Sequence, residues 1–72
     1  MSDNFKLLYQ HENQSVRLFA QTVYDLRNSQ GSYSRMYRNI GEFTEDELNE
    51  LIDILSQQNF KDNVDVVLYL EG

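Results

Sequence analysis

Six carboxylates crowd into one stretch of the chain, GEFTEDELNELID at residues 41–53, which contains no basic residue. Paired carboxylates can act as general acid and base, but that chemistry needs a cleft that perturbs their pKa values. On an exposed helix face, water keeps such groups ionised. A calcium loop places oxygen ligands at alternate positions around a central glycine, whereas these acids follow Gly41 and run into a helix. The stretch therefore predicts neither an acid–base pair nor a metal site.

Other catalytic groups are equally scarce. His11 is the only histidine and lies in the polar run HENQ, and the chain has no cysteine. A thiolate metal site and a disulfide are thus impossible, and no glycine-rich phosphate loop is present. We expect no enzymatic activity and no cofactor. At 72 residues, the chain predicts a single small domain, residues 1–72, built around one core.

The charge of the chain is concentrated in its second half. The formal net charge is −6, and residues 42–72 carry nine acids against Lys61 alone. No apolar run approaches the roughly 18 residues of a membrane span, and the N-terminus does not resemble a secretion signal. We therefore expect a cytoplasmic protein that does not bind membranes. The acidic half is either a solvated face that maintains solubility or an electrostatic binding surface.

Apolar spacing predicts an all-α fold, a compact bundle of about five short helices. Asp3 or Asn4 can cap a first short helix, and Ser15 is the expected N-cap of a longer helix that runs to about Asn28. A third helix is expected over 32–40. A fourth follows over 44–57, where Thr44-Glu45-Asp46-Glu47 matches a capping box. Its expected inner stripe is Leu48, Leu51, Ile52 and Leu55.

The last segment, NVDVVLYLEG, is compatible with either a strand or a helix. Its β-branched residues favour a strand, but nothing else in the chain has the alternating pattern of a pairing partner. Val64, Val67 and Leu68 also fit one helical face, with Asp62 as a possible cap. We predict a short, mostly buried helix that closes the domain.

Helices 32–40 and 44–57, joined by Gly41-Glu42-Phe43, resemble a helix-turn-helix pair. Tyr37 stands where a small residue usually permits close crossing, and the apolar Leu48 and Leu51 come one position later than in a standard motif. The turn would therefore be longer than usual and the crossing angle different. The second helix would be the one that reads DNA, yet phosphate contacts need lysine and arginine. Its acids would be repelled by DNA and would instead complement a basic protein surface. Tyrosines are frequent anchors at such interfaces. The predicted partner-binding residues are Tyr33, Tyr37, Glu42, Phe43, Glu45, Asp46, Glu50 and Asp53.

The short chain, the helix pair, the acidic second helix and the ending FKDNVDVVLYLEG resemble the modulator-of-repression antirepressors of temperate phages of lactococci and related bacteria. The resemblance implies a small helical protein, acting in the bacterial cytoplasm, that binds the N-terminal helix-turn-helix domain of the phage lysogeny repressor. It would block operator binding and so favour the lytic side of the genetic switch. We expect a monomer before complex formation.

Two alternatives follow from the same residues. The arginines at positions 17, 27, 35 and 38 could support a small Cro-like dimeric regulator that binds DNA with an affinity that falls steeply with salt. Alternatively, the acidic helix could inhibit a different DNA-binding enzyme, such as a nuclease or a polymerase.

Overall fold

The computed structural model describes residues 4–26 and 42–72, and within them the chain forms four helices and no strand. These are α1 (Asn4–Tyr9), α2 (Gln14–Leu26), α4 (Glu45–Ser56) and α5 (Asn63–Glu71). The expected all-α class is therefore confirmed for these residues. The predicted helix over 32–40 and the turn glycine Gly41 lie outside the described residues. The fifth helix and the helix-turn-helix pair accordingly stay predictions.

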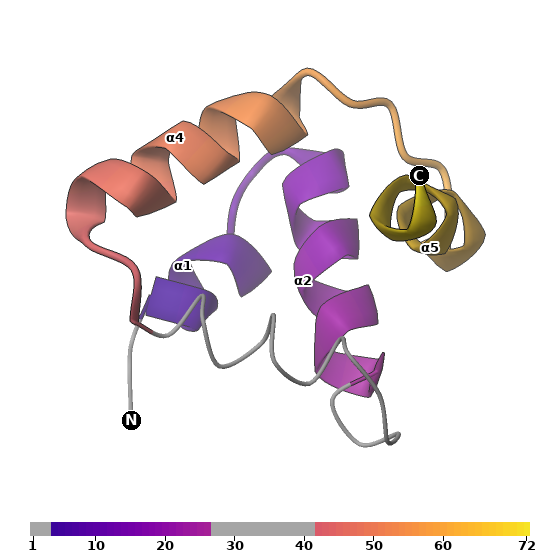
Figure 1. Cartoon of the computed structure of the whole chain (residues 1–72), viewed down its shortest axis with the longest axis horizontal. Helices are drawn as coiled ribbons and strands as arrows, with labels where there is room; N and C mark the ends of the chain where they lie inside the picture. The colour runs from indigo at the N-terminus through magenta and orange to yellow at the C-terminus, as the bar shows by residue number, and fades with distance from the viewer. Residues whose placement is uncertain (1–3, 27–41) are drawn as a thin grey trace.

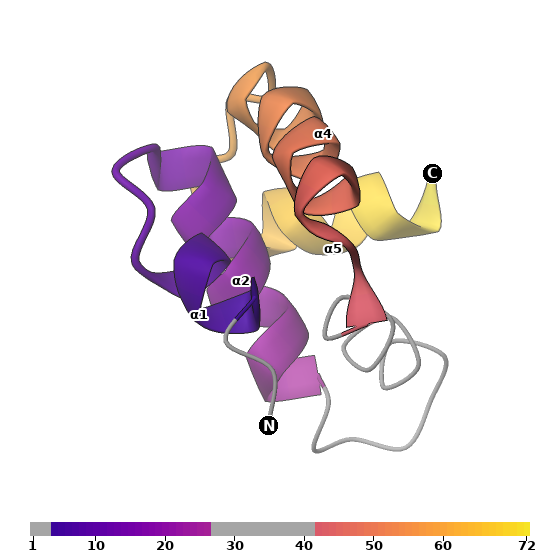
Figure 2. The ribbon, with the colours of Figure 1, turned by 90° about the vertical axis from the view of Figure 1, so that its left-hand side faces the viewer.

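Helix α2 forms the centre of the fold. It packs against α1, α4 and α5, and α1 also contacts α4. Figure 1 shows α4 running across the top of α2, with α5 seen end-on at the right. Figure 2 shows the same arrangement from the side, with α1 against α2 and α5 extending away behind α4. The Cα radius of gyration is 11.2 Å, which matches the value of about 11 Å expected for a folded chain of this length.

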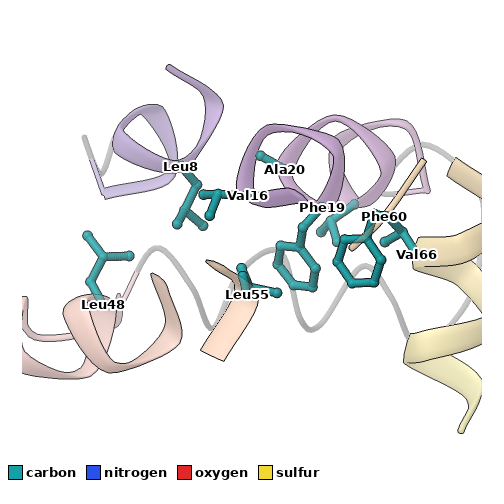
Figure 3. Packing of buried hydrophobic residues seen from close by; sticks show 9 residues of the cluster. Leu8, Val16, Phe19, Ala20, Leu48, Leu55, Phe60 and Val66 are labelled. Carbon is teal, nitrogen blue, oxygen red and sulfur yellow. The ribbon is translucent and has the colours of Figure 1, made fainter. Parts of the chain in front are cut away.

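One contiguous apolar core joins the helices. Helix α4 contributes Leu48 and Leu55, which are 2% and 0% exposed, while Leu51 and Ile52 pack at the margin of the core. This is the inner stripe that the spacing predicts for residues 44–57. Figure 3 shows buried side chains of the four helices gathered together with Phe60, which lies in the loop between α4 and α5. The buried apolar residues are Leu8, Val16, Phe19, Ala20, Val23, Leu48, Leu55, Phe60 and Val66.

The start of α2 differs from the prediction. Ser15 is not the N-cap, because the Asn13 side chain occupies that role: its Oδ1 accepts hydrogen bonds from the amides of Ser15, at 2.8 Å, and Val16, at 3.3 Å. A cap residue satisfies amides that the first turn of a helix cannot pair internally. The Ser15 side chain is instead buried and serves a tertiary contact.

That contact fixes the connection between α4 and α5. Ser15 Oγ donates to the carbonyl of Gln58 at 2.9 Å and accepts from the amide of Phe60 at 3.0 Å. The Gln14 side-chain amide adds a bond to the Phe60 carbonyl at 3.2 Å. Two residues at the start of α2 thus pair the backbone of a loop more than 40 positions away, which holds Phe60 in the core.

The ambiguous last segment is a helix. Asp62 caps it, with its side chain accepting from the Asp65 amide at 3.2 Å, as expected. The expectation that this helix is mostly buried is wrong. Only Val66 is fully buried, whereas Val64 is 58% and Leu68 is 61% exposed. The buried face of α5 is therefore centred on Val66 and not on the predicted face of Val64, Val67 and Leu68. The helix packs on α2 through one side only.

Candidate protein-binding surface

The outward side of α4 carries a line of carboxylates. Asp46, Glu50 and Asp53 are exposed and follow one another at i, i+4 and i+7, so they share one face of the helix. We call these three residues the acidic stripe. At about 1.5 Å per residue the acidic stripe spans roughly 10 Å along the helix. Leu48 and Leu55 occupy the opposite side, which orients the acidic stripe away from the core.

No cation offsets the acidic stripe within α4. The helix, EDELNELIDILS, contains no lysine, arginine or histidine. Carboxylates four residues apart, such as Asp46 and Glu50, slightly destabilise a helix, whereas an acid followed by a lysine at that spacing stabilises it. Surfaces that serve solubility alone commonly mix both signs of charge. The acidic stripe therefore carries an electrostatic cost that a basic partner would remove.

Acidic residues in the first turn of α4 stabilise the start of the helix. The Thr44 hydroxyl accepts from the Glu47 amide at 3.2 Å, and Glu47 Oε1 accepts from the Thr44 amide at 2.9 Å, which completes the predicted capping box. The bond from the Thr44 amide, followed by that of its hydroxyl, lowers the pKa of the exposed Glu47 carboxyl below its ordinary value. Glu45 and Asp46 share this first turn, where negative charge suits the helix dipole.

The acidic stripe accounts for three of the eight predicted site residues, and the other five divide into three groups. Glu42, before the start of α4, and Glu45, its first residue, are both exposed. Phe43 is half-buried and packs against the core, so only part of its ring can reach a partner. Tyr33 and Tyr37 lie outside the described residues.

One candidate contact was missed in the sequence. Ile54 lies four residues beyond Glu50, on the flank of the acidic stripe, and is 43% exposed. It falls outside the inner stripe of Leu48, Leu51, Ile52 and Leu55. The signal in the sequence was an apolar residue that lies outside the inner stripe, on a side of the helix that is otherwise polar.

The remaining polar side chains near α2 have local roles. Arg17 Nη1 donates to the carbonyls of His11, at 2.8 Å, and Glu12, at 2.6 Å, which closes the turn between α1 and α2. His11 Nδ1 accepts from the Asn13 amide at 3.0 Å. Arg17 is one of the four arginines on which the DNA-binding alternative depends, and its side chain is hydrogen-bonded to the backbone of its own chain.

Two absences apply to the part of the chain that the structure describes, residues 4–26 and 42–72. Among these residues, no three histidine or carboxylate side chains come together as ligands for a metal ion. None of the helices described there combines the length and the apolar character needed to cross a membrane.

Comparison with known proteins adds no relationship. The sequence matches no protein-family model, and neither the curated proteins nor the solved structures provide a match.

Proposed function

We propose that this protein is an antirepressor that binds the N-terminal helix-turn-helix domain of a phage lysogeny repressor and occludes its DNA-binding face. The observation that carries the proposal is the acidic stripe on α4, exposed and without a basic neighbour on its own helix. The resemblance of the sequence to modulator-of-repression antirepressors supplies the identity of the partner. Occlusion requires no catalysis and no cofactor.

The charge of α4 suits this target. A DNA-binding domain presents lysine and arginine side chains that neutralise phosphates. Carboxylates at Asp46, Glu50 and Asp53 can pair with the same side chains, and the negative field steers the encounter. DNA and this protein would then compete for one surface, so that repression is lifted by mass action.

Charge alone gives weak and salt-sensitive association, so an apolar contact is also needed. Ile54 is the exposed apolar side chain on the flank of the acidic stripe, and Phe43 has a partly exposed ring near the start of α4. Desolvated apolar anchors surrounded by polar contacts are the usual source of binding energy in protein interfaces. We assign Ile54 as the anchor and the acidic stripe as the surrounding charged contact.

A competition assay tests the proposal. Labelled operator DNA is bound to the N-terminal domain of the lysogeny repressor from the same phage, and its fluorescence anisotropy is followed as this protein is added. The expected result is full displacement of the DNA. The double variant Glu50→Lys with Asp53→Lys should raise the half-displacing concentration by about tenfold or more. Both positions lie beyond the first turn, so neither change opposes the capping box or the helix dipole.

The matched control changes the same charge elsewhere. Glu12→Lys with Asp25→Lys also adds four charge units, at exposed positions before and within α2. Its half-displacing concentration should stay within about twofold of that of the unchanged protein, because long-range charge effects are screened over roughly 8 Å at physiological salt. If both double variants displaced the DNA equally poorly, the effect would come from net charge, and α4 would have no specific role in binding. Binding of the DNA itself by this protein would favour the Cro-like alternative.

A further inference from the structure

Helix α5 is apolar on more sides than the fold can bury. Six of its nine residues are valine, leucine or tyrosine, yet only Val66 is fully buried. A helix that is hydrophobic all round is normally enclosed on all sides. Three of the six are valines, which lower the intrinsic preference for helix, so α5 depends on packing for its stability. Its outer side is therefore available for a second contact.

The outer side has a defined composition. Val64 and Leu68 lie one turn apart on the face opposite Val66, and more than half of each side chain is exposed. Asp65 flanks this apolar pair on one side and Glu71 on the other, by the helical repeat of 100° per residue. We call Val64, Leu68, Asp65 and Glu71 the α5 strip. It combines a small apolar centre with an acidic rim.

The negative charge of the rim favours some binding partners for the α5 strip over others. Pairing of two copies through the α5 strip would bring together two acidic rims and two chains of net charge −6, which repel each other. An amphipathic helix with leucine-like residues on one side and lysine or arginine beside them matches both the centre and the rim. Apolar side chains of such a helix, spaced at i, i+3 and i+4, would pack beside Val64 and Leu68, while its cations would pair with the acidic rim.

We propose that the α5 strip is a docking surface for a cationic amphipathic helix of a partner protein. The surface is separate from the acidic stripe, and the two helices that carry them both pack on α2. The inference goes beyond the antirepressor function and does not depend on it. Leu68 supplies the main apolar contact, because it is the most exposed large apolar residue of the described chain.

A synthetic peptide tests the proposal without a known partner. The probe is a fluorescent helical peptide of about 14 residues, roughly four turns, with leucine on one face and lysine on the other. Its binding to the full chain is followed by anisotropy at 150 mM salt, an ionic strength at which exposed charges are largely screened beyond roughly 8 Å. The expected result is saturable binding that Leu68→Ser weakens by about tenfold or more.

Three controls separate the outcomes. Leu7→Ser makes the same change at a residue of α1 that is 55% exposed, and it should alter the affinity by less than about twofold. The variant Glu50→Lys with Asp53→Lys should retain most of the binding, which separates the α5 strip from the acidic stripe. A peptide with glutamate in place of lysine should not bind.

The proposal is overturned by several results. One is an equal loss of peptide affinity in Leu7→Ser and Leu68→Ser. Another is a loss caused by the Glu50→Lys, Asp53→Lys variant and not by Leu68→Ser, since the peptide would then be held by α4. A third is a dimer in sedimentation equilibrium that Leu68→Ser dissociates, which would assign the α5 strip to a second copy of the chain.

Discussion

Removal of either of two buried hydroxyls on α2 should change the free energy of unfolding, in opposite directions at the two positions. Ser15 is 5% exposed and Thr22 is 4% exposed, and both lie on the core side of the helix. Ser15 Oγ makes two hydrogen bonds to the loop before α5, to the Gln58 carbonyl and from the Phe60 amide. Thr22 Oγ1 has no hydrogen-bond partner among the described residues. The same kind of group is thus satisfied at one position and unsatisfied at the other.

Ser15→Ala removes both bonds and leaves the Phe60 amide buried without an acceptor. Each bond contributes about 0.5–1.5 kcal/mol, so the free energy of unfolding should fall by about 2 kcal/mol. A domain of this size has a net stability of about 3–5 kcal/mol, so the loss is close to half of it. At about 4–8 °C per kcal/mol, the Tm should fall by roughly 8–16 °C.

Thr22→Val keeps the shape of the side chain and removes the unsatisfied hydroxyl. A buried polar group without a partner costs about 1–3 kcal/mol, so the variant should gain about 1 kcal/mol, and its Tm should rise by roughly 4–8 °C. Urea titrations followed by circular dichroism measure both changes. Ser56→Ala, at an exposed serine that ends α4, serves as the control and should stay within about 0.5 kcal/mol. A Ser15→Ala protein as stable as this control, or a destabilised Thr22→Val protein, would refute the hydrogen-bond reasoning.

Further predictions concern α4. Thr44→Ala removes the capping hydroxyl and should lower the free energy of unfolding by about 1 kcal/mol in a denaturant titration; an unchanged midpoint would show that the cap does not stabilise the fold. The pKa of Glu47 is lowered in the folded protein, so its contribution is present above its unfolded pKa and lost as the pH falls through the folded value. The stability difference between the unchanged protein and Glu47→Gln should therefore shrink in acid, below about pH 4, and a difference that persists there contradicts the assignment. Leu55 is fully buried, so Leu55→Ala should cost about 2–5 kcal/mol and lower the Tm measured by circular dichroism by at least about 8 °C; a melt near that of the unchanged protein would place Leu55 outside the core.

The parts of the fold that the sequence predicted correctly depend on local rules. The capping box at Thr44 and Glu47 needs only side chains three residues apart and the amides between them. The buried stripe of α4 follows from helical periodicity, which also placed Glu50 and Asp53 on the exposed face. The cap at Asp62 obeys the same local rule.

The parts that were predicted wrongly depend on tertiary contacts. Ser15 has the composition of an N-cap, but its partners are Gln58 and Phe60, more than 40 residues away, and no local pattern encodes that pairing. Asn13, two residues earlier, is an equally good cap by type. In α5, apolar residues occur on every side, so periodicity could not select Val66 over Val64 or Leu68 as the buried one. The position of the helix against α2 decides that.

The candidate site shows the same division. Exposure of the acidic stripe was predictable because a helix must turn its apolar side inward. The exposure of Leu68 was not, since it depends on which neighbours cover α5, and that of Ile54 was signalled only by its position outside the inner stripe of α4. Apolar residues left over after a core face has been assigned are therefore useful candidates for partner contacts.

The most direct test of the proposed antirepressor function maps the surface of this protein that changes when a repressor domain is added. The ¹⁵N-labelled protein is titrated with the N-terminal domain of the lysogeny repressor from the same phage, and amide chemical shifts are followed by NMR. We expect the largest changes along α4, at Asp46, Glu50, Asp53 and Ile54, with smaller changes at the exposed side of α2. Changes centred on Arg17 and α2 with α4 unaffected, or no changes at concentrations that displace the operator, would contradict it.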